Sequence, residues 1–138
     1  MQIAAMKRLS MPFPKLERVK ARHREAAGLL DSMANYVCRQ MAAHEEFVIP
    51  KLAAADLGLS EGEAFVLLKM MADEDVVKQQ FNVYCRTHGI LLQSVDKLDG
   101  LDDIKWCDFC DRQHGPNELF VEIAFRLSEK LGASDLAA

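Results

Sequence analysis

The stretch Leu57-Gly58-Leu59-Ser60-Glu61-Gly62-Glu63 ends one predicted helix and begins the next. Gly58 can take the left-handed conformation that closes a helix, because it has no Cβ atom to clash. Ser60 and Glu63 have the spacing of a capping box, in which each side chain accepts a hydrogen bond from the backbone of the other. The stretch therefore predicts a short helix over residues 51–57, a tight turn and a longer helix that starts after Ser60.

The segments on either side of this turn extend the pattern. Residues 16–43 lack proline and are predicted to be helical, with a break near Gly28, and Phe47-Val48-Ile49-Pro50 is predicted to be extended. After the longer helix, apolar and polar residues alternate, as in a half-buried strand. The apolar positions are Val77, Phe81, Val83 and Cys85, and the polar positions between them are Lys78, Gln80 and Asn82.

This order of helix, short strand, short helix, turn, longer helix and strand resembles the winged helix-turn-helix superfamily. The resemblance covers about Ser32 to Leu92 and is carried by Leu52-Ala53, by residues 57–60 and by the strand that begins at Val76. It implies a mainly α fold with a small β part, an α+β class. Domains of this superfamily serve both as nucleic-acid readers and as protein-docking modules.

A second pattern follows the strand, with the spacing C-x2-H-x18-C-x2-C. It consists of Cys85-Arg86-Thr87-His88-Gly89 and Cys107-Asp108-Phe109-Cys110. A gap of two residues lets a tight turn direct both ligands at one ion, and two such pairs give the four ligands that Zn²⁺ prefers. Three thiolates and one imidazole leave no open position for water, so the sequence predicts a structural zinc site made by Cys85, His88, Cys107 and Cys110.

One further histidine and two other interpretations accompany this site. His114 lies three residues after Cys110 and could replace His88 as the fourth ligand. A redox pair of Cys107 and Cys110 would need a βαβ context, which the sequence does not show. Over Tyr84 to Asp111 the chain resembles a zinc ribbon, a rubredoxin-like knuckle pair that departs from the all-cysteine form by His88. Cys38, outside the pattern, is predicted to be a buried small hydrophobe.

The end of the chain is predicted to be a helix from Asn117 to about Leu131. Its apolar residues cover more than one face, so we expect it to bind a protein partner or a second copy of the chain. The apolar residues are Leu119, Phe120, Val121, Ile123, Ala124, Phe125, Leu127 and Leu131.

Charge is distributed unevenly over the 138 residues. Residues 1–24 contain seven basic residues and one acidic residue, whereas the other 114 contain ten basic and twenty acidic residues. A basic arm of this kind could bind nucleic acid without reading its sequence. No segment has the roughly 18 consecutive apolar residues of a membrane span, and the first residues lack the apolar core of an export signal, so we expect a cytoplasmic location.

Four regions are predicted from these patterns. They are a basic extended arm (1–15), a helical segment with a winged-helix core (16–84), a zinc ribbon (85–115) and an amphipathic helix with a tail (116–138). No nucleophile elbow, phosphate loop or paired-carboxylate arrangement is present, so we expect no enzymatic activity. The function predicted is a zinc-stabilised adaptor or accessory subunit of an intracellular assembly. The alternatives are a DNA-binding transcriptional regulator and, with weaker support, a thiol redox sensor.

Overall fold

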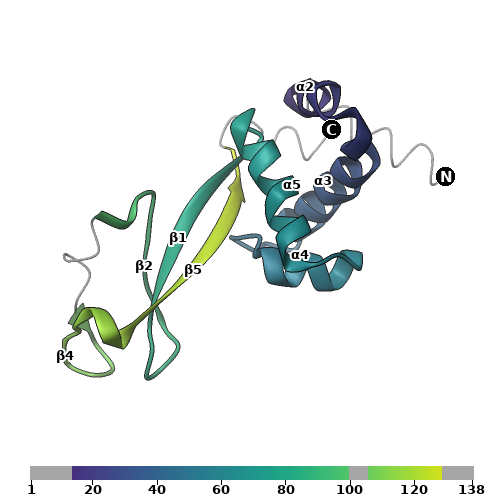
Figure 1. The fold of residues 1–138 in the computed structure, drawn as a ribbon. Coiled ribbons are helices and arrows are strands. Elements are labelled where there is room, and N and C mark those ends of the chain that lie inside the picture. The colour runs from purple at the N-terminus through teal and green to yellow at the C-terminus, as the bar shows by residue number, and fades with distance from the viewer. Residues whose placement is uncertain (1–13, 100–105, 129–138) are drawn as a thin grey trace. The chain divides into compact units, whose positions relative to one another are not determined.

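A computed structural model describes residues 14–99 and 106–128 of the chain (Figure 1). The chain folds as two compact units. The first comprises the described residues up to Lys78 together with those from Phe125 onward, and the second is Gln79–Ala124. The fold belongs to the α+β class, as predicted, because four helices and a three-stranded antiparallel sheet make up most of the described residues.

The helices of the first unit follow the predicted order. They are α2 (Pro14–Arg22), the 3-10 turn η1 (Arg24–Ala26), α3 (Ala27–Ala42), α4 (Pro50–Leu57) and α5 (Glu61–Asp73). The break in the long N-terminal helical run lies at His23, where φ is −128° and ψ is 63°, and not near Gly28 as predicted. None of the described helices is long and apolar enough to cross a membrane.

The turn between α4 and α5 has the predicted geometry. Gly58 closes α4 with φ at 70°. The Glu63 amide donates to Ser60 Oγ at 3.0 Å, and the Ser60 amide donates to Glu63 Oε1 at 2.8 Å. Both bonds of the capping box are therefore formed, and they fix the first turn of α5.

The core of the first unit is built on the inner faces of these helices. Phe125 enters it from the last strand, fully buried, with its ring in edge contact with Phe65 of α5 at a centroid distance of 6.0 Å. The backbone of Val48 forms two hydrogen bonds with that of Phe125, at 2.6 and 2.9 Å, which confirms the predicted extended piece between α3 and α4. Other fully buried side chains include Leu16, Val19, Leu30, Met33, Leu68 and Met71.

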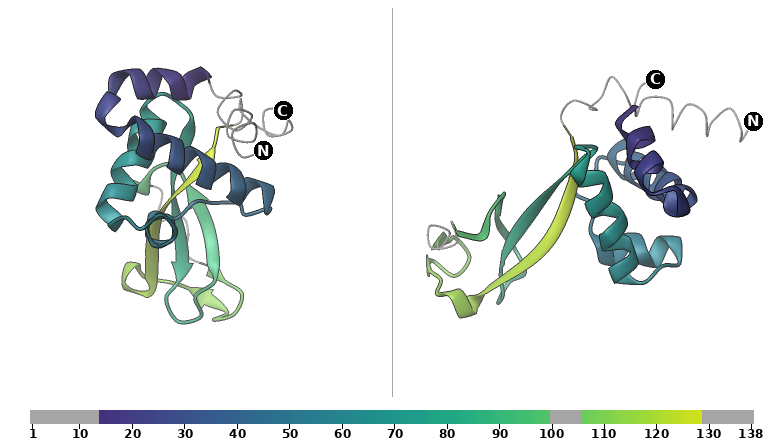
Figure 2. Two further views of the ribbon diagram at one scale, coloured as in Figure 1. Left: turned by 90° about the vertical axis from the view of Figure 1, so that its right-hand side faces the viewer. Right: turned by 45° about the horizontal axis from the view of Figure 1, so that its top comes forward.

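Three strands form the main sheet, in the order β2-β1-β5. They are β1 (Val77–Cys85), β2 (Leu91–Val95) and β5 (Leu119–Leu127), and Figure 2 shows β1 and β5 running side by side in both views. β1 and β2 are antiparallel, with a register shift between Val83 and Tyr84. Two short strands, β3 (Trp106–Cys107) and β4 (Arg112–Gln113), pair separately as a hairpin.

β1 confirms the predicted strand, but its polar residues are not all on a solvent-facing side as the half-buried pattern predicted. Gln80 and Asn82, expected to face solvent, are 6% and 0% exposed. Gln80 donates to Asp96 Oδ1 at 3.0 Å, and Asn82 Oδ1 accepts from Ser94 Oγ at 2.6 Å. These bonds provide partners for Gln80 Nε2 and Asn82 Oδ1, whereas Asn82 Nδ2 has no hydrogen-bond partner in the described part of the structure. A period-two pattern does not reveal such buried polar side chains.

The predicted C-terminal helix is wrong. Residues 119–127 form strand β5, which follows a 3-10 turn over Pro116–Glu118. An apolar run that covers more than one face is compatible with a buried strand as well as with a buried helix. The β-branched Val121 and Ile123 and the aromatic Phe120 favour the strand, and β1 provides the backbone partners. The tail after Ser128 lies outside the described residues.

The predicted basic arm is helical from Pro14 onward. Lys15 pairs with Asp75 at 3.2 Å, and both Arg18 and Arg22 pair with Glu74, at 3.4 and 2.9 Å. These cations of α2 are thus already matched by carboxylates at the end of α5. Residues 1–13, which include the rest of the arm, lie outside the described residues.

Candidate metal centre

The first half of the predicted site is a tight turn at the end of β1. The Gly89 amide donates to the Cys85 carbonyl at 2.7 Å, and the Cys85 amide donates to the Ile90 carbonyl at 2.9 Å. Gly89 has φ at 66°, a conformation that an L-residue adopts only at a cost. The turn places the side chains of Cys85 and His88 on the same side, with Cys85 Sγ 3.6 Å from His88 Nδ1.

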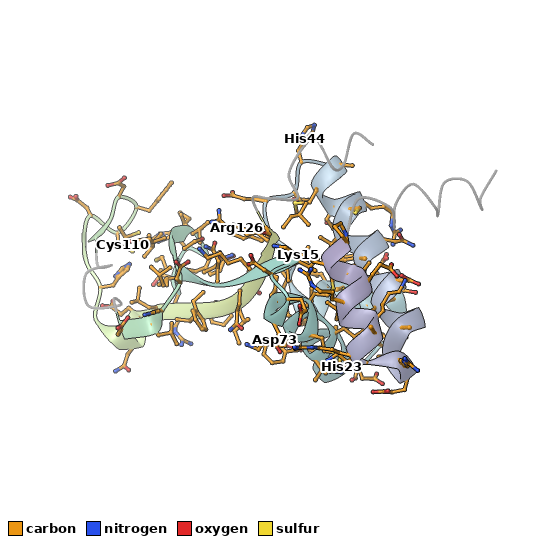
Figure 3. All side chains as sticks on the ribbon, turned by 90° about the horizontal axis from the view of Figure 1, so that it is seen from above. Lys15, His23, His44, Asp73, Cys110 and Arg126 are labelled. Carbon is orange, nitrogen blue, oxygen red and sulfur yellow. The ribbon has the colours of Figure 1, made fainter. Side chains whose placement is uncertain are left out.

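The second half is a turn of the same kind between β3 and β4. The Asp111 amide donates to the Cys107 carbonyl at 2.7 Å, and Asp111 has φ at 54°. Cys110 lies in this turn (Figure 3). Cys107 is buried and Cys110 is half-buried, and neither forms a disulfide.

The two turns, together with His114 directly after β4, bring three thiols and one imidazole together. One ligand atom from each of Cys85, Cys107, Cys110 and His114 lies within 4.8 Å of all the others. The Sγ atoms of Cys85 and Cys110 are 3.7 Å apart. Tetrahedral zinc with Zn–S bonds of about 2.3 Å separates two sulfur ligands by about 3.8 Å. This group could therefore hold a metal ion, and its donors are those that zinc prefers.

His88 adjoins the same group. Its Nδ1 atom lies 3.2 Å from Cys110 Sγ and 3.6 Å from Cys85 Sγ. Bond lengths of about 2.3 Å to sulfur and 2.0–2.1 Å to nitrogen place two such tetrahedral ligands about 3.6 Å apart. The structure thus brings both histidines to the thiols, and the assignment of His88 as the fourth ligand stays a prediction.

His114 differs from His88 in its surroundings. The His114 side chain is fully buried, and neither ring nitrogen has a hydrogen-bond partner in the described part of the structure. The nearest carboxylate oxygen, Glu118 Oε1, is 3.8 Å from Nδ1 and already accepts from the Gly115 amide at 3.0 Å. Buried polar atoms are rarely left without a partner. A metal ion bound between the thiols and this ring would provide one.

The thiols differ in how readily each one ionises. Desolvation raises the pKa of Cys85. Hydrogen bonds from the His88 amide and ring, and from the side chains of Cys110 and His114, outweigh it and lower the pKa to about 6. Desolvation, together with the adjacent thiols of Cys85 and Cys107, raises the pKa of Cys110 to about 11. Close thiols resist becoming anionic together unless a cation compensates them, and a divalent metal does so.

Among its described residues, the second unit contains a small buried apolar cluster. It consists of Val83 and Leu119, and the partly buried residues packed against them are Leu92, Val95 and Val121. Units of roughly 40 residues seldom fold on hydrophobic burial alone and commonly use a metal or disulfides. All four cysteines are free, so no disulfide stabilises this unit, whereas the four-donor group could hold a metal ion.

Three of the four predicted ligands lie in the four-donor group, and His114 completes it. The spacing C-x2-C-x3-H marks His114 as a candidate. Sequence alone ranks it below His88, because the symmetry of the two turns favours the histidine that is in the turn. Local spacing does not describe the burial of His114 beside Cys85, which is distant in the sequence.

Comparisons with known proteins found no relative of this chain. No protein-family model, no curated protein and no solved structure matches the chain.

Proposed function

We propose that this chain is a non-catalytic interaction module whose second unit, Gln79–Ala124, is stabilised by one structural zinc ion. The observation that carries the proposal is the four-donor group with the buried, unpartnered ring of His114. Three thiolates and an imidazole fill a tetrahedral shell and leave no position for a reacting water. The ion therefore holds the two turns together and takes no part in a reaction.

Metal analysis of matched cysteine variants tests the zinc site. We expect about one zinc per chain, lost in Cys107→Ala and kept in Cys38→Ala, because Cys38 is buried in α3 and belongs to the first unit. Chelation of the wild type should unfold residues 79–124, since metal binding contributes directly to the folding of such units. A metal-free protein that gives the same amide spectrum as the zinc-loaded protein would contradict the proposal.

The interaction role is supported by an exposed aromatic patch on the sheet. Phe120 is 48% exposed and lies against Tyr84, with ring centroids 6.1 Å apart. Both line a hollow of about 480 Å³ that also presents Arg86 and Glu122. Exposed aromatic residues beside charged ones are typical of protein-binding surfaces.

A second copy of the chain is the partner that we propose for this surface. β5 is an edge strand of the β2-β1-β5 sheet, and edge strands can pair with a symmetry-related copy of themselves. Light scattering should find a dimer in the wild type and a monomer in Phe120→Asp, with unchanged circular dichroism. A monomeric wild-type protein would exclude the dimer.

Charge argues against the alternative of a DNA-binding regulator. α5 would be the recognition helix, and its first turn carries the exposed Glu61 and Glu63, which repel phosphates. Three cations of α2 that could bind a DNA backbone, Lys15, Arg18 and Arg22, are paired with carboxylates of the same unit, Glu74 and Asp75. The adaptor interpretation is therefore the one that we favour.

A further inference from the structure

We infer that the metal centre has five donors for four positions, and that His88 and His114 exchange with each other as the fourth ligand. The inference rests on the zinc site proposed above and adds a route by which the ion enters and leaves. Cys85, Cys107 and Cys110 are the fixed ligands in this scheme.

His88 lies against two of the three thiols in the group that His114 completes. The Sγ atoms of Cys85 and Cys110 lie 3.7 Å apart, and both belong to the group that contains His114. His88 lies beside the same two sulfur atoms, and its Nδ1 atom is within 3.6 Å of both. An ion bound to these sulfurs is thus within reach of either ring.

The two rings differ in access to solvent. His114 is fully buried, whereas His88 is exposed and its ring lies 6.0 Å from that of Phe109, which is 68% exposed. A buried ligand without competing hydrogen bonds holds an ion most tightly. We therefore assign His114 to the resting site and His88 to the solvent side.

Exchange between the rings needs no other reactant. Zn²⁺ has no geometric preference from its d electrons and can expand to five ligands in passing. One Zn–N bond forms as the other breaks, both imidazoles are neutral when they bind, and the three thiolates stay bound. The ion keeps its charge and gains no water, so it passes from His114 to the exposed His88 without leaving the protein.

This arrangement separates the two roles of the histidines. Loss of His114 should weaken the affinity for zinc, because the resting ligand is removed. Loss of His88 should leave the affinity nearly unchanged but slow the transfer of zinc to an acceptor, because the solvent-side step is removed. A site with one functional histidine cannot separate affinity from transfer rate in this way.

The experiment compares the full-length wild type with His88→Ala, His114→Ala and the double variant. Cobalt titration reports the ligand set, since tetrahedral thiolate coordination gives intense visible bands, and a chromogenic chelator reports zinc affinity and transfer rate. We expect one tetrahedral cobalt in each single variant and an affinity loss for the double variant well beyond the roughly 10–100-fold typical of indirect ligand effects. His88→Ala should transfer zinc about tenfold or more slowly than the wild type, a barrier increase of about 1.4 kcal/mol.

Three outcomes would overturn the inference. Loss of tetrahedral cobalt in either single variant would show that only one histidine serves the site. Unchanged zinc transfer in His88→Ala would show that the exposed ring is not part of the route. A wild type that binds no metal would reject the proposed zinc site itself, and this result is distinct from the other two.

Discussion

Gly89 and Asp111 occupy equivalent positions in two copies of one turn. Each donates its amide to the carbonyl of a cysteine four residues earlier, Cys85 or Cys107, at 2.7 Å. Each also has a positive φ, 66° for Gly89 and 54° for Asp111. The two halves of the metal centre are therefore the same local structure, although one ends in C-x2-H-G and the other in C-x2-C-D.

This equivalence predicts opposite effects of two substitutions. Gly89→Ala should weaken zinc binding by about 1–2 kcal/mol, because a Cβ atom disfavours the left-handed conformation. Asp111→Gly should strengthen it by up to about 1 kcal/mol, because it relieves that strain. Competition with a chelator measures both. Gly115→Ala is the control: its φ is not in the left-handed range and the added Cβ meets Glu118 Oε1 at an ordinary 3.9 Å, so a similar loss there would contradict the explanation.

Thiol labelling should separate Cys38 from the cysteines of the site. Burial raises the pKa of Cys38 from 9.0 to about 11, so its thiol stays protonated and unreactive at pH 8. Mass spectrometry should find no rapid alkylation of the zinc-loaded protein, three labels after chelation and four in urea. Rapid native labelling of Cys38 would be inconsistent with its burial.

The same pKa shift predicts a loss of stability at high pH. The raised pKa means that the folded state keeps the Cys38 proton when the unfolded chain has lost it. This contribution to the free energy of unfolding is complete below about pH 9 and falls as pH rises toward 11. Cys38→Ala should remove this part of the pH dependence, and an unchanged slope would assign it to other groups.

The capping box should contribute measurably to the first unit. Ser60→Ala should lower the free energy of unfolding by about 1 kcal/mol, because the Glu63 amide loses its acceptor. Ser32→Ala is the matched control, since the exposed Ser32 hydroxyl only donates to the Gly28 carbonyl in its own helix. Denaturant titration of the two variants gives the comparison, and equal losses would contradict the capping role.

The contribution of the capping box to stability should also depend on pH. Hydrogen bonds from the Ser60 backbone and side chain hold the pKa of Glu63 below its usual 4.5. A depressed carboxyl pKa stabilises the fold above about pH 4.5, and that stabilisation is lost as pH falls through the lowered value. The effect of Glu63→Gln on stability should therefore be larger at pH 7 than at pH 3, and no difference would exclude the charged form as the partner.

Replacing either of two phenylalanines of β5 by alanine should affect stability to very different extents. Phe125→Ala should cost about 3–5 kcal/mol, because the side chain is completely buried and its loss leaves a cavity. Phe120→Ala should cost far less in the monomer, since Phe120 is 48% exposed. Thermal unfolding measures both, and a similar loss for the two variants would show that Phe120 belongs to a core.

Duplex DNA should bind weakly and without sequence preference. A mobility-shift titration at physiological salt, with random and genomic duplexes, should show at most salt-sensitive binding that disappears when residues 1–24 are deleted. That deletion also removes α2 and takes Leu16 and Val19 out of the core. Circular dichroism must therefore check that the shortened protein still folds. Tight binding to one sequence that is weakened by changes in α5 would favour the regulator.

Local sequence signals determined most of the first unit and the position of β1. The Gly58 turn, the capping box of Ser60 and Glu63, and the position of β1 all follow from interactions between residues close together in the chain. The pairs around Cys85 and Cys107 are local in the same way, because each is one tight turn closed by one backbone hydrogen bond. Such features can be predicted because their energy depends on few residues.

Only the tertiary structure decided the state of the last segment and the setting of the histidines. Residues 119–127 are a strand because β1, more than thirty residues earlier, offers its backbone, and an apolar run alone does not distinguish a buried strand from a buried helix. Gln80 and Asn82 are buried because Asp96 and Ser94 lie opposite them. The sequence spacing placed His88 beside the thiols, but the burial of His114 among them depends on contacts distant along the chain, whose energies no local pattern encodes.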